Sequence, residues 1–381
     1  MPFTNPSTVG NVFVVGRLPT VTYNPRENLG LESQLQEYLE DRGALLSVSG
    51  PTKTGKTTLL RSAAASGVWL SGGAVSSRDE FWRTVGEGLY ADSSTAAGKS
   101  IGLIRQDLVD SDRCLVVDDF HYIDQGIQLE IVRSLKDLVF EGLPVVVASV
   151  PHRAYDAVRV EKEMTGRVAH LSISPWDDEE LISIARKGFS ALNLVDDDSG
   201  LAQRLSKESF SSPHLMQQFC KRLCRENGIS KTLSEPSVLI APDSWVDFFS
   251  QSAADTSKAA FDLLAQGPRR RTDRMQRQLT DGRTVDIYGA VLEAIANTGP
   301  TLAIEYDQLR VSLREVLKDE VPQRHEVTRV LDQMTKIAKE DIEGEPVVDY
   351  DESLSTLHVS DPYFAFYLRW GQPGRVLPGQ E

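Results

Sequence analysis

Cysteine is scarce in this chain, with 3 among 381 residues. Cys220 and Cys224 lie four residues apart in a segment with a helical pattern, and Cys114 lies in an apolar, strand-like run. A structural zinc site needs four ligands at recognisable spacings, and a disulfide framework needs a larger set of cysteines in a small secreted chain. The pattern indicates neither, and we predict three buried, inert thiols.

Long hydrophobic runs are missing as well. A helix that crosses a bilayer needs about 20 predominantly apolar residues, and the sequence contains no run of that kind. Its first residues, 1–6, lack the charged start and the apolar middle of a secretory signal peptide. These two absences predict a cytoplasmic protein that does not contact a membrane.

Basic residues are outnumbered by acidic ones, 41 to 55, which gives a formal net charge of −14 at pH 7. Such a balance opposes indiscriminate binding to nucleic acid, although a local basic patch can still bind it. The only clear patch is Arg269–Arg277, which includes Arg270, Arg271 and Arg274. A contact with a phosphate backbone and a solvated linker are both open for this cluster.

The most specific motif is a glycine-rich loop. The eight residues Gly50–Thr57 follow the apolar run 44–48 and fit the pattern G-x-x-x-x-G-K-[ST]. A helical pattern comes next, over 58–65. Strand, glycine loop and helix in this order form the context in which the pattern binds phosphate. We therefore predict nucleotide contacts from Gly50, Pro51, Thr52, Lys53, Thr54, Gly55, Lys56, Thr57 and Thr58.

The chemistry of phosphate binding explains each key residue of this loop. Gly50 and Gly55 permit backbone angles that turn N–H groups toward one centre, and the following helix adds the positive end of its dipole. Polyphosphate is the natural ligand of such a loop. Lys56 is expected to reach the β- and γ-phosphates, and Thr57 to bind Mg²⁺.

An acidic pair ends a second apolar run, 114–117. A continuous apolar strand that ends in acid is typical of a buried parallel strand whose C-terminal tip faces the nucleotide. In that position we expect Asp118 to hold Mg²⁺ through water and Asp119 to polarise the attacking water. The alternative is a solvated turn after a core strand.

Two further residues are candidates because of their positions. Ser149 ends an apolar run where a γ-phosphate sensor would lie, although a strand cap explains it equally well. Arg167 precedes another strand and is a candidate arginine finger that reaches a neighbouring subunit's phosphate. A surface ion pair is the alternative for Arg167, and Arg153 and Arg159 are weaker candidates for the finger.

The chain predicts an α/β protein of several parts, because 381 residues are too many for one compact core. Helical patterns at 287–297, 306–317 and 324–337 precede two alternating runs, which together describe a winged helix. Its third helix mixes basic and acidic residues, so DNA binding and docking to protein both remain open. We expect an N-terminal extension at 1–22, extended or partly disordered, a P-loop core at 23–174, a helical lid at 175–233, a helical connector with the basic cluster at 234–285, the winged helix at 286–371 and a tail at 372–381.

Together these motifs resemble the AAA+ and STAND branches of the P-loop ATPases, over residues 23–225 and more weakly to the C-terminus. Gly50–Thr57 matches Walker A, and Leu115–Asp119 matches Walker B. Val116–His121 is similar to the STAND form of Walker B, and Val359–Trp370 to the close of the winged helix in archaeal-type and Orc/Cdc6-like ATPases. The resemblance implies a P-loop core with a parallel sheet, a helical lid and a C-terminal winged helix, with ATP and Mg²⁺ as ligands.

The resemblance also implies contacts around the adenine. Arg26, followed by Glu27, is similar to the Arg-Glu pair that lies beside this base, and Pro175 belongs to a segment that resembles the strand-to-lid junction. His214 lies in the segment that resembles the sensor-2 region of the lid. Two departures stand out, because Asp119 replaces the usual Glu and His214 the usual sensor Arg, and both fit slow hydrolysis or nucleotide-locked switching.

The function implied is that of a slow, Mg²⁺-dependent ATPase that hydrolyses ATP to ADP and phosphate. It would act as an oligomerising switch that regulates a separately encoded effector protein, for example in bacterial antiphage defence. No segment resembling a nuclease, protease or TIR effector is present, which motivates the separate partner. One alternative is a DNA-binding AAA+ ATPase of the initiator or transposition-regulator type. It would use the winged helix and Arg269–Arg277 on DNA. A second is a nucleotide-gated transcription regulator without turnover.

Overall fold

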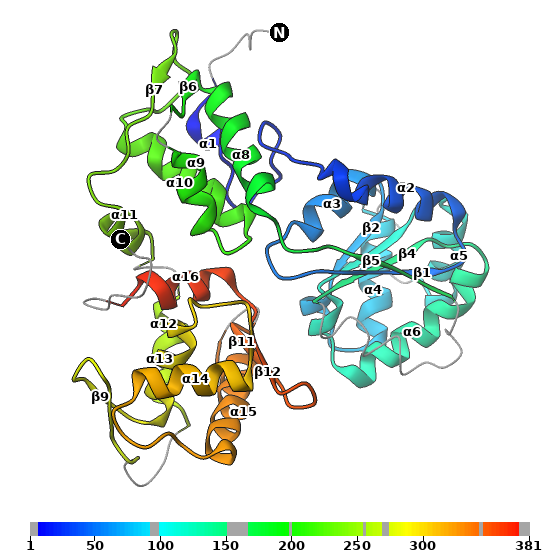
Figure 1. Ribbon diagram of the computed structural model, residues 1–381. Coiled ribbons are helices and arrows are strands. Elements are labelled where there is room, and N and C mark those ends of the chain that lie inside the picture. Colours follow the sequence, from blue (N-terminus) through cyan, green and yellow to red (C-terminus); the bar gives the residue numbers. More distant parts are fainter. Residues whose placement is uncertain are drawn as a thin grey trace. The chain divides into compact units, whose positions relative to one another are not determined.

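The computed structural model describes residues 7–91, 99–150, 167–197, 200–253, 257–268, 274–342 and 346–372. The chain forms two compact units (Figure 1). One is Tyr23–Trp176, and the other combines Met1–Thr22 with Asp177–Glu381. The first unit carries the glycine-rich loop, and the second carries the segments predicted as lid and winged helix.

Five parallel strands form the centre of the first unit, in the order β2-β3-β4-β1-β5. Side chains alternate between the two faces of the sheet, so that Leu45 and Leu46 enter different apolar clusters. Burial on both faces explains why the central strands read as continuous apolar runs. The strands are β1 (Leu45–Ser49), β2 (Val68–Ser71), β3 (Leu115–Asp118), β4 (Val145–Ser149) and β5 (Val168–Ser172).

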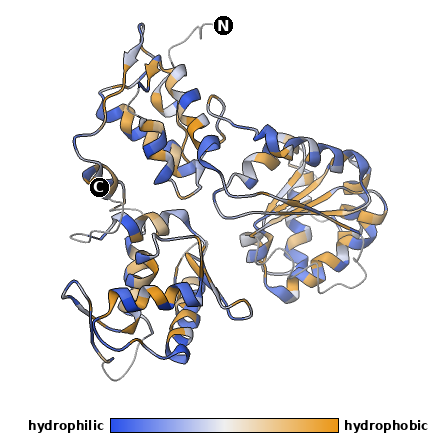
Figure 2. Ribbon diagram, viewed as in Figure 1, coloured by the Kyte–Doolittle hydropathy of each residue, from blue (hydrophilic) through white to orange (hydrophobic). Residues whose placement is uncertain are grey.

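Helices cover both faces of this sheet, and their apolar sides face the strands (Figure 2). One face packs against α2 (Leu31–Asp41) and α3 (Lys56–Ala63). The other packs against α4 (Arg78–Leu89), α5 (Ile101–Asp110) and α6 (Gln125–Phe140). Short 3-10 turns complete the unit, η1 (Glu27–Leu29), η2 (Gly72–Ala74) and η3 (Phe120–Tyr122). This α/β core confirms the predicted fold class.

The N-terminal segment packs into the second unit. The sequence predicted an extended or partly disordered stretch, but its described part contains the short helix α1 (Val9–Val12) and the buried side chain of Phe13. The Phe13 ring lies 5.5 Å from that of Phe189, and a Cβ on Gly188 would approach it to 2.2 Å. The described part of the segment therefore makes apolar contacts with the second unit that local sequence does not reveal.

The predicted lid segment is helical. Between residues 175 and 233 it contains α8 (Asp178–Ala191), β6 (Leu194–Val195), α9 (Leu201–Lys207) and α10 (Pro213–Glu226). The predicted connector then begins with β7 (Ser237–Val238) and α11 (Trp245–Ala253). A capping box between Asp177 and Glu180 starts α8, and its acidic first turn complements the positive end of the helix dipole.

The C-terminal part has the topology of a winged helix. Helices α13 (Ile287–Asn297), α14 (Tyr306–Val316) and α15 (Arg324–Glu340) precede the hairpin of β11 (Val348–Asp351) and β12 (Thr356–Val359). A strand of three residues, β10 (Ala303–Glu305), pairs with β12 and was missed because so short a run has no periodicity. The remaining elements are α12 (Lys258–Gln266), β8 (Arg277–Gln278), β9 (Thr284–Val285) and α16 (Pro362–Trp370). In the parts of the chain that the structure describes, no helix has both the length and the apolar character to cross a membrane.

Candidate nucleotide-binding site

The glycine-rich loop connects β1 to α3 and is folded around a lysine. Lys56 is buried, and its Nζ donates hydrogen bonds to the carbonyl oxygens of Gly50 and Pro51, both at 2.9 Å. Thr54 Oγ1 also donates to the Pro51 carbonyl, at 2.7 Å. These bonds hold one positive charge inside a ring of backbone groups, where a phosphate chain needs it. The other predicted loop residues, Thr52, Lys53 and Thr58, lie in the same turn or in the first turn of α3.

The two glycines of the loop are required for different reasons. Gly55 has a φ of +96°, which side chains other than glycine rarely adopt. A Cβ on Gly50 would approach the carbonyl oxygen of Ile173 to 2.9 Å. The first therefore makes the turn into α3, and the second lets the loop lie against the chain that follows β5.

The predicted metal ligands lie together. Thr57 Oγ1 donates a hydrogen bond of 2.6 Å to Oδ2 of Asp118 at the tip of β3. Mg²⁺ prefers hard oxygen ligands and is commonly held by one or two protein oxygens together with phosphate and water. One hydroxyl and one carboxylate beside a phosphate loop fit this ion. The described residues contain no group of three or more His, Cys, Asp or Glu side chains arranged to hold a metal without a ligand's help.

Asp119 is held in an unusual backbone conformation. Its φ is +53°, a region that Asp tolerates better than most residues, and its N–H donates to Asp118 Oδ1 at 3.1 Å. Partial burial raises the pKa of the Asp119 carboxyl, the charge of Asp118 raises it further, and Lys56 partly offsets both. A raised pKa makes this carboxylate a better proton acceptor.

Gly72 lies against the backbone of Asp119, a contact that sequence reasoning missed. A Cβ at Gly72 would lie 2.2 Å from the carbonyl oxygen of Asp119, so only glycine lets η2 lie against the start of η3. The Gly72-Gly73 pair after β2 was a detectable signal, but only the fold shows what approaches it.

Ser149 lies at the carboxyl end of β4, beside Ser49 of β1. Its carbonyl accepts the N–H of Gly50 at 3.3 Å, while its hydroxyl is buried and has no hydrogen-bond partner among the described residues. A buried hydroxyl without a partner is unfavourable. A polar ligand above the loop would relieve that cost.

Arg26 and Pro175 are brought together beside the loop. The buried Arg26 guanidinium donates to the carbonyl oxygens of Ser174, at 2.8 Å, and Pro175, at 3.0 Å. The same group lies 5.0 Å from the centre of the Trp176 ring. Trp176 Nε1 in turn donates to the Thr54 carbonyl at 2.7 Å. Trp176, which was not among the predicted site residues, thus links this cluster to the phosphate loop.

Arg167 and His214 have other surroundings. Arg167 precedes β5 at the amino end of the sheet, and its guanidinium lies 5.0 Å from the Phe140 ring. The phosphate loop follows the carboxyl end of β1, at the opposite edge of the sheet from Arg167. At ~3.3 Å per residue, the length of the strand separates these two edges by about 13 Å. In the second unit, His214 Nδ1 is hydrogen bonded to the Tyr363 hydroxyl, which donates to Gln218 Oε1 at 2.8 Å.

The basic cluster is described only in part, since Arg269, Arg270 and Arg271 lie outside the described residues, as do Arg153 and Arg159. Arg274 donates to Asp286 at 2.6 Å and to two backbone carbonyls. Arg277 donates to the Glu320 carbonyl at 3.1 Å. Its two described arginines therefore bind neighbouring parts of the chain.

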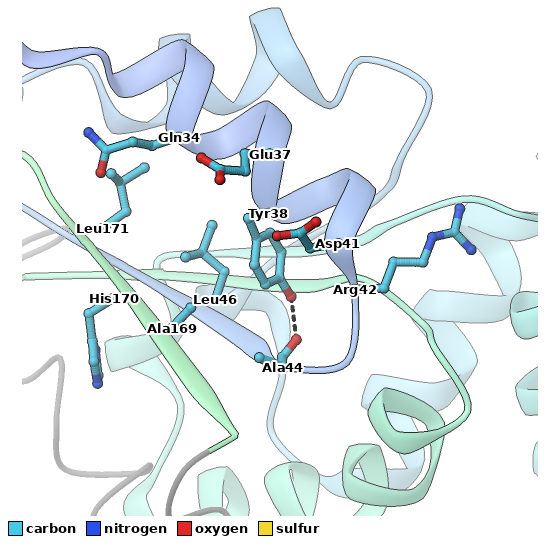
Figure 3. Close-up of a pocket in the computed structure, with 10 residues that line it drawn as sticks. All are labelled: Gln34, Glu37, Tyr38, Asp41, Arg42, Ala44, Leu46, Ala169, His170 and Leu171. Atoms are coloured by element: carbon cyan, nitrogen blue, oxygen red, sulfur yellow. Dashed lines mark hydrogen bonds between the residues drawn. The ribbon is translucent and has the colours of Figure 1, made fainter.

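A cavity of about 340 Å³ lies elsewhere in the first unit, between α2 and β5 (Figure 3). Gln34, Glu37, Tyr38 and Asp41 line it from α2, and Ala169 and His170 line it from β5. Ala44 also lines it, just before β1. Because that residue precedes the strand whereas the phosphate loop follows it, the cavity is separate from the candidate nucleotide site.

A parallel sheet with a phosphate loop after β1, and a threonine of that loop hydrogen bonded to an aspartate at the end of β3, are the features of a P-loop NTPase fold, here followed by a winged helix. No family model matches the chain, and no curated protein matches it significantly. Among solved structures it is similar to the Orc2 protein of Aeropyrum pernix, in its ADPNP and ADP complexes, with 12% identity and a TM-score of 0.50 over 94% of this chain and 96% of that one. Cdc6p of Pyrobaculum aerophilum has 12% identity and a TM-score of 0.45, over 93% of this chain and 95% of that one. A Pyrococcus horikoshii STAND protein with a tetratricopeptide repeat sensor has 14% identity and a TM-score of 0.38, over 90% of this chain and 42% of that one. The likeness to Orc2 shows the fold.

Proposed function

We propose that this protein binds ATP with Mg²⁺, hydrolyses it slowly and uses the nucleotide as a conformational switch. The observation that carries the proposal is the convergence of Lys56 with the Thr57 and Asp118 pair at one edge of the sheet. A cation, a hydroxyl and a carboxylate at the end of a phosphate loop serve both to bind polyphosphate and to hold its metal ion.

The residues of the chain have distinct roles in this proposal. Lys56 leaves the Gly50 and Pro51 carbonyls and neutralises charge on the β- and γ-phosphates. Thr57 and Asp118 hold Mg²⁺, which supplies further charge neutralisation on the phosphates when bound. Ser149 donates its hydroxyl to the γ-phosphate. Arg26 and Pro175 border the adenine.

Asp119 orients the attacking water and accepts its proton as the water oxygen bonds to the γ-phosphorus and the bond to ADP breaks. The raised pKa of Asp119 supports this role. Its side chain is one methylene shorter than the glutamate usual in AAA+ ATPases, which supports slow turnover because water must be held at a fixed distance from the phosphorus.

The biological role that we propose is regulation of a separately encoded effector by an oligomer of this chain, with Arg167 reaching a neighbour's phosphate. Cation–π packing of Arg167 on Phe140, whose side chain is 72% exposed, leaves the arginine at the surface of its own unit. DNA binding is the second candidate. The internal hydrogen bonds of Arg274 and Arg277 favour the effector role over it.

The proposal is tested by titrating the protein with ATP and Mg²⁺ in a calorimeter. Lys56→Ala is expected to weaken ATP binding by at least a hundredfold, because the buried charge of the loop is lost. Arg61→Ala is the matched control, since it removes a positive charge from the same helix that packs on Trp69 instead. Equal ATP affinity in Lys56→Ala and the wild type would refute ATP binding at this loop.

A further inference from the structure

An apolar patch is exposed on the small ribbon of β6 and β7 in the second unit. The two strands are parallel, and Val195 pairs with Val238. Side chains alternate along a strand, and the burial pattern continues this alternation past the end of β7, so Val195, Val238 and Ile240 lie on one face and Leu194 and Leu239 on the other. The first three are 44%, 53% and 72% exposed, whereas the two leucines are buried. The inner face therefore belongs to the core, and the outer face presents three β-branched side chains to solvent.

Both backbone polar groups of the most exposed of these residues are hydrogen bonded. The Asn227 side chain accepts a hydrogen bond from the N–H of Ile240 at 2.8 Å and donates one to its carbonyl at 3.0 Å. On the other side, the N–H of Leu239 donates to the Val195 carbonyl at 2.9 Å. Asn227 satisfies the backbone of Ile240, so an added strand cannot extend past this residue. The patch is therefore available through its side chains, in a fixed arrangement that lowers the entropic cost of binding.

Acidic residues predominate in the two segments that carry the patch. The segments 192–197 and 229–243 contain four acidic residues, Asp196, Asp197, Glu235 and Asp243, against one lysine, Lys231. Asp196 accepts the first N–H groups of α9, while the other three acids are exposed. Two copies of this face packed against each other would bring like charges together, which disfavours self-pairing.

We propose that Val195, Val238 and Ile240 form the docking surface for a second protein, whose contacting face is apolar at its centre and basic at its rim. Three adjacent apolar side chains on a rigid outer face differ from the scattered exposed leucines that any surface carries. An apolar centre with a charged rim is the usual anatomy of a specific interface. The proposal rests on the proposed function in one respect, because this surface would receive the separately encoded effector.

The test uses a labelled amphipathic helical peptide with a leucine face flanked by lysines, and a copy with glutamate in place of lysine. The full chain is expected to bind the lysine peptide at least tenfold more tightly than the glutamate peptide. Ile240→Asp should weaken the binding of the lysine peptide at least tenfold. Leu354→Asp changes an exposed leucine outside the patch and should leave the affinity for the lysine peptide within twofold of the wild type. Val238→Thr, which keeps the shape of the side chain, should weaken it severalfold and serves if Ile240→Asp does not fold.

Three outcomes would overturn the docking surface. They are equal affinity for the two peptides, equal loss in Ile240→Asp and Leu354→Asp, and a dimer in sedimentation that Ile240→Asp converts to monomers, which would make a second copy the occupant. The nucleotide site is tested separately in the same variants. Ile240→Asp should bind ATP normally, and Lys56→Ala should bind the peptide normally without nucleotide.

Discussion

Trp176 Nε1 donates a hydrogen bond of 2.7 Å to the backbone carbonyl of Thr54. Trp176 is the last residue of the first unit, and Thr54 lies within the phosphate loop. The loop is therefore bound directly to the point where the chain leaves the sheet domain. A change in the loop on nucleotide binding would reach this junction without passing through any other side chain.

Trp176→Phe is expected to weaken ATP binding two- to tenfold, because the ring remains while a hydrogen bond of about 0.5 to 1.5 kcal/mol is lost. Calorimetric titration with ATP and Mg²⁺ measures the change. Trp69→Phe is the control, since the Trp69 indole donates to Ala64 rather than to the loop. Unchanged affinity in Trp176→Phe would mean that the bond does not position the loop.

Gly72→Ala is expected to slow phosphate release at least tenfold while ATP binding is retained. The new Cβ would lie 2.2 Å from the Asp119 carbonyl, so Asp119 must move, and small displacements of a residue that positions water are costly to the rate. Gly73→Ala provides a matched comparison, because its Cβ would meet nothing closer than 4.0 Å. Normal turnover in Gly72→Ala would argue against a role for Asp119 in hydrolysis.

Asp119→Asn is expected to abolish phosphate release and to raise the thermal stability of the protein at pH 7. The pKa of Asp119 is raised in the folded state, chiefly by burial, so its ionisation costs stability as the pH rises from the unfolded pKa through the folded one. Below the ordinary pKa of aspartate, Asp119 is protonated in both the folded and the unfolded wild type, so this cost disappears. Thermal unfolding at pH 7 and at about pH 3.5 measures the difference, and an equal gain at both values would contradict the assignment.

Glu208→Ala is expected to destabilise the second unit by about 3 to 5 kcal/mol, because it leaves a buried charge unpaired. The buried Glu208 carboxylate accepts hydrogen bonds from Arg369 Nε at 2.9 Å and from Trp370 Nε1 at 2.7 Å. Asp262→Ala breaks an exposed pair with Lys258 and should cost less than about 1 kcal/mol. Urea unfolding compares the two, and a similar small loss in both would show that the Glu208 network adds little.

The sequence by itself determined the parts that depend on local patterns. The loop at Gly50–Thr57 with its flanking strand and helix, the acid at the end of β3, and the helices and hairpin of the winged helix follow from spacing and periodicity over a few turns. Each is encoded in consecutive residues, because glycine conformations, strand alternation and helical faces are short-range properties.

Only the tertiary structure decided which distant residues meet. Trp176 reaches Thr54 across 122 positions, Gly72 lies against Asp119, and Phe13 packs on Gly188 in a segment predicted as extended or disordered. His214 is hydrogen bonded to Tyr363, 149 positions away in its own unit, and its place beside the nucleotide stays a prediction. Contacts of this kind depend on how complete elements pack, and no local pattern records them, since packing selects partners by shape and not by separation along the chain.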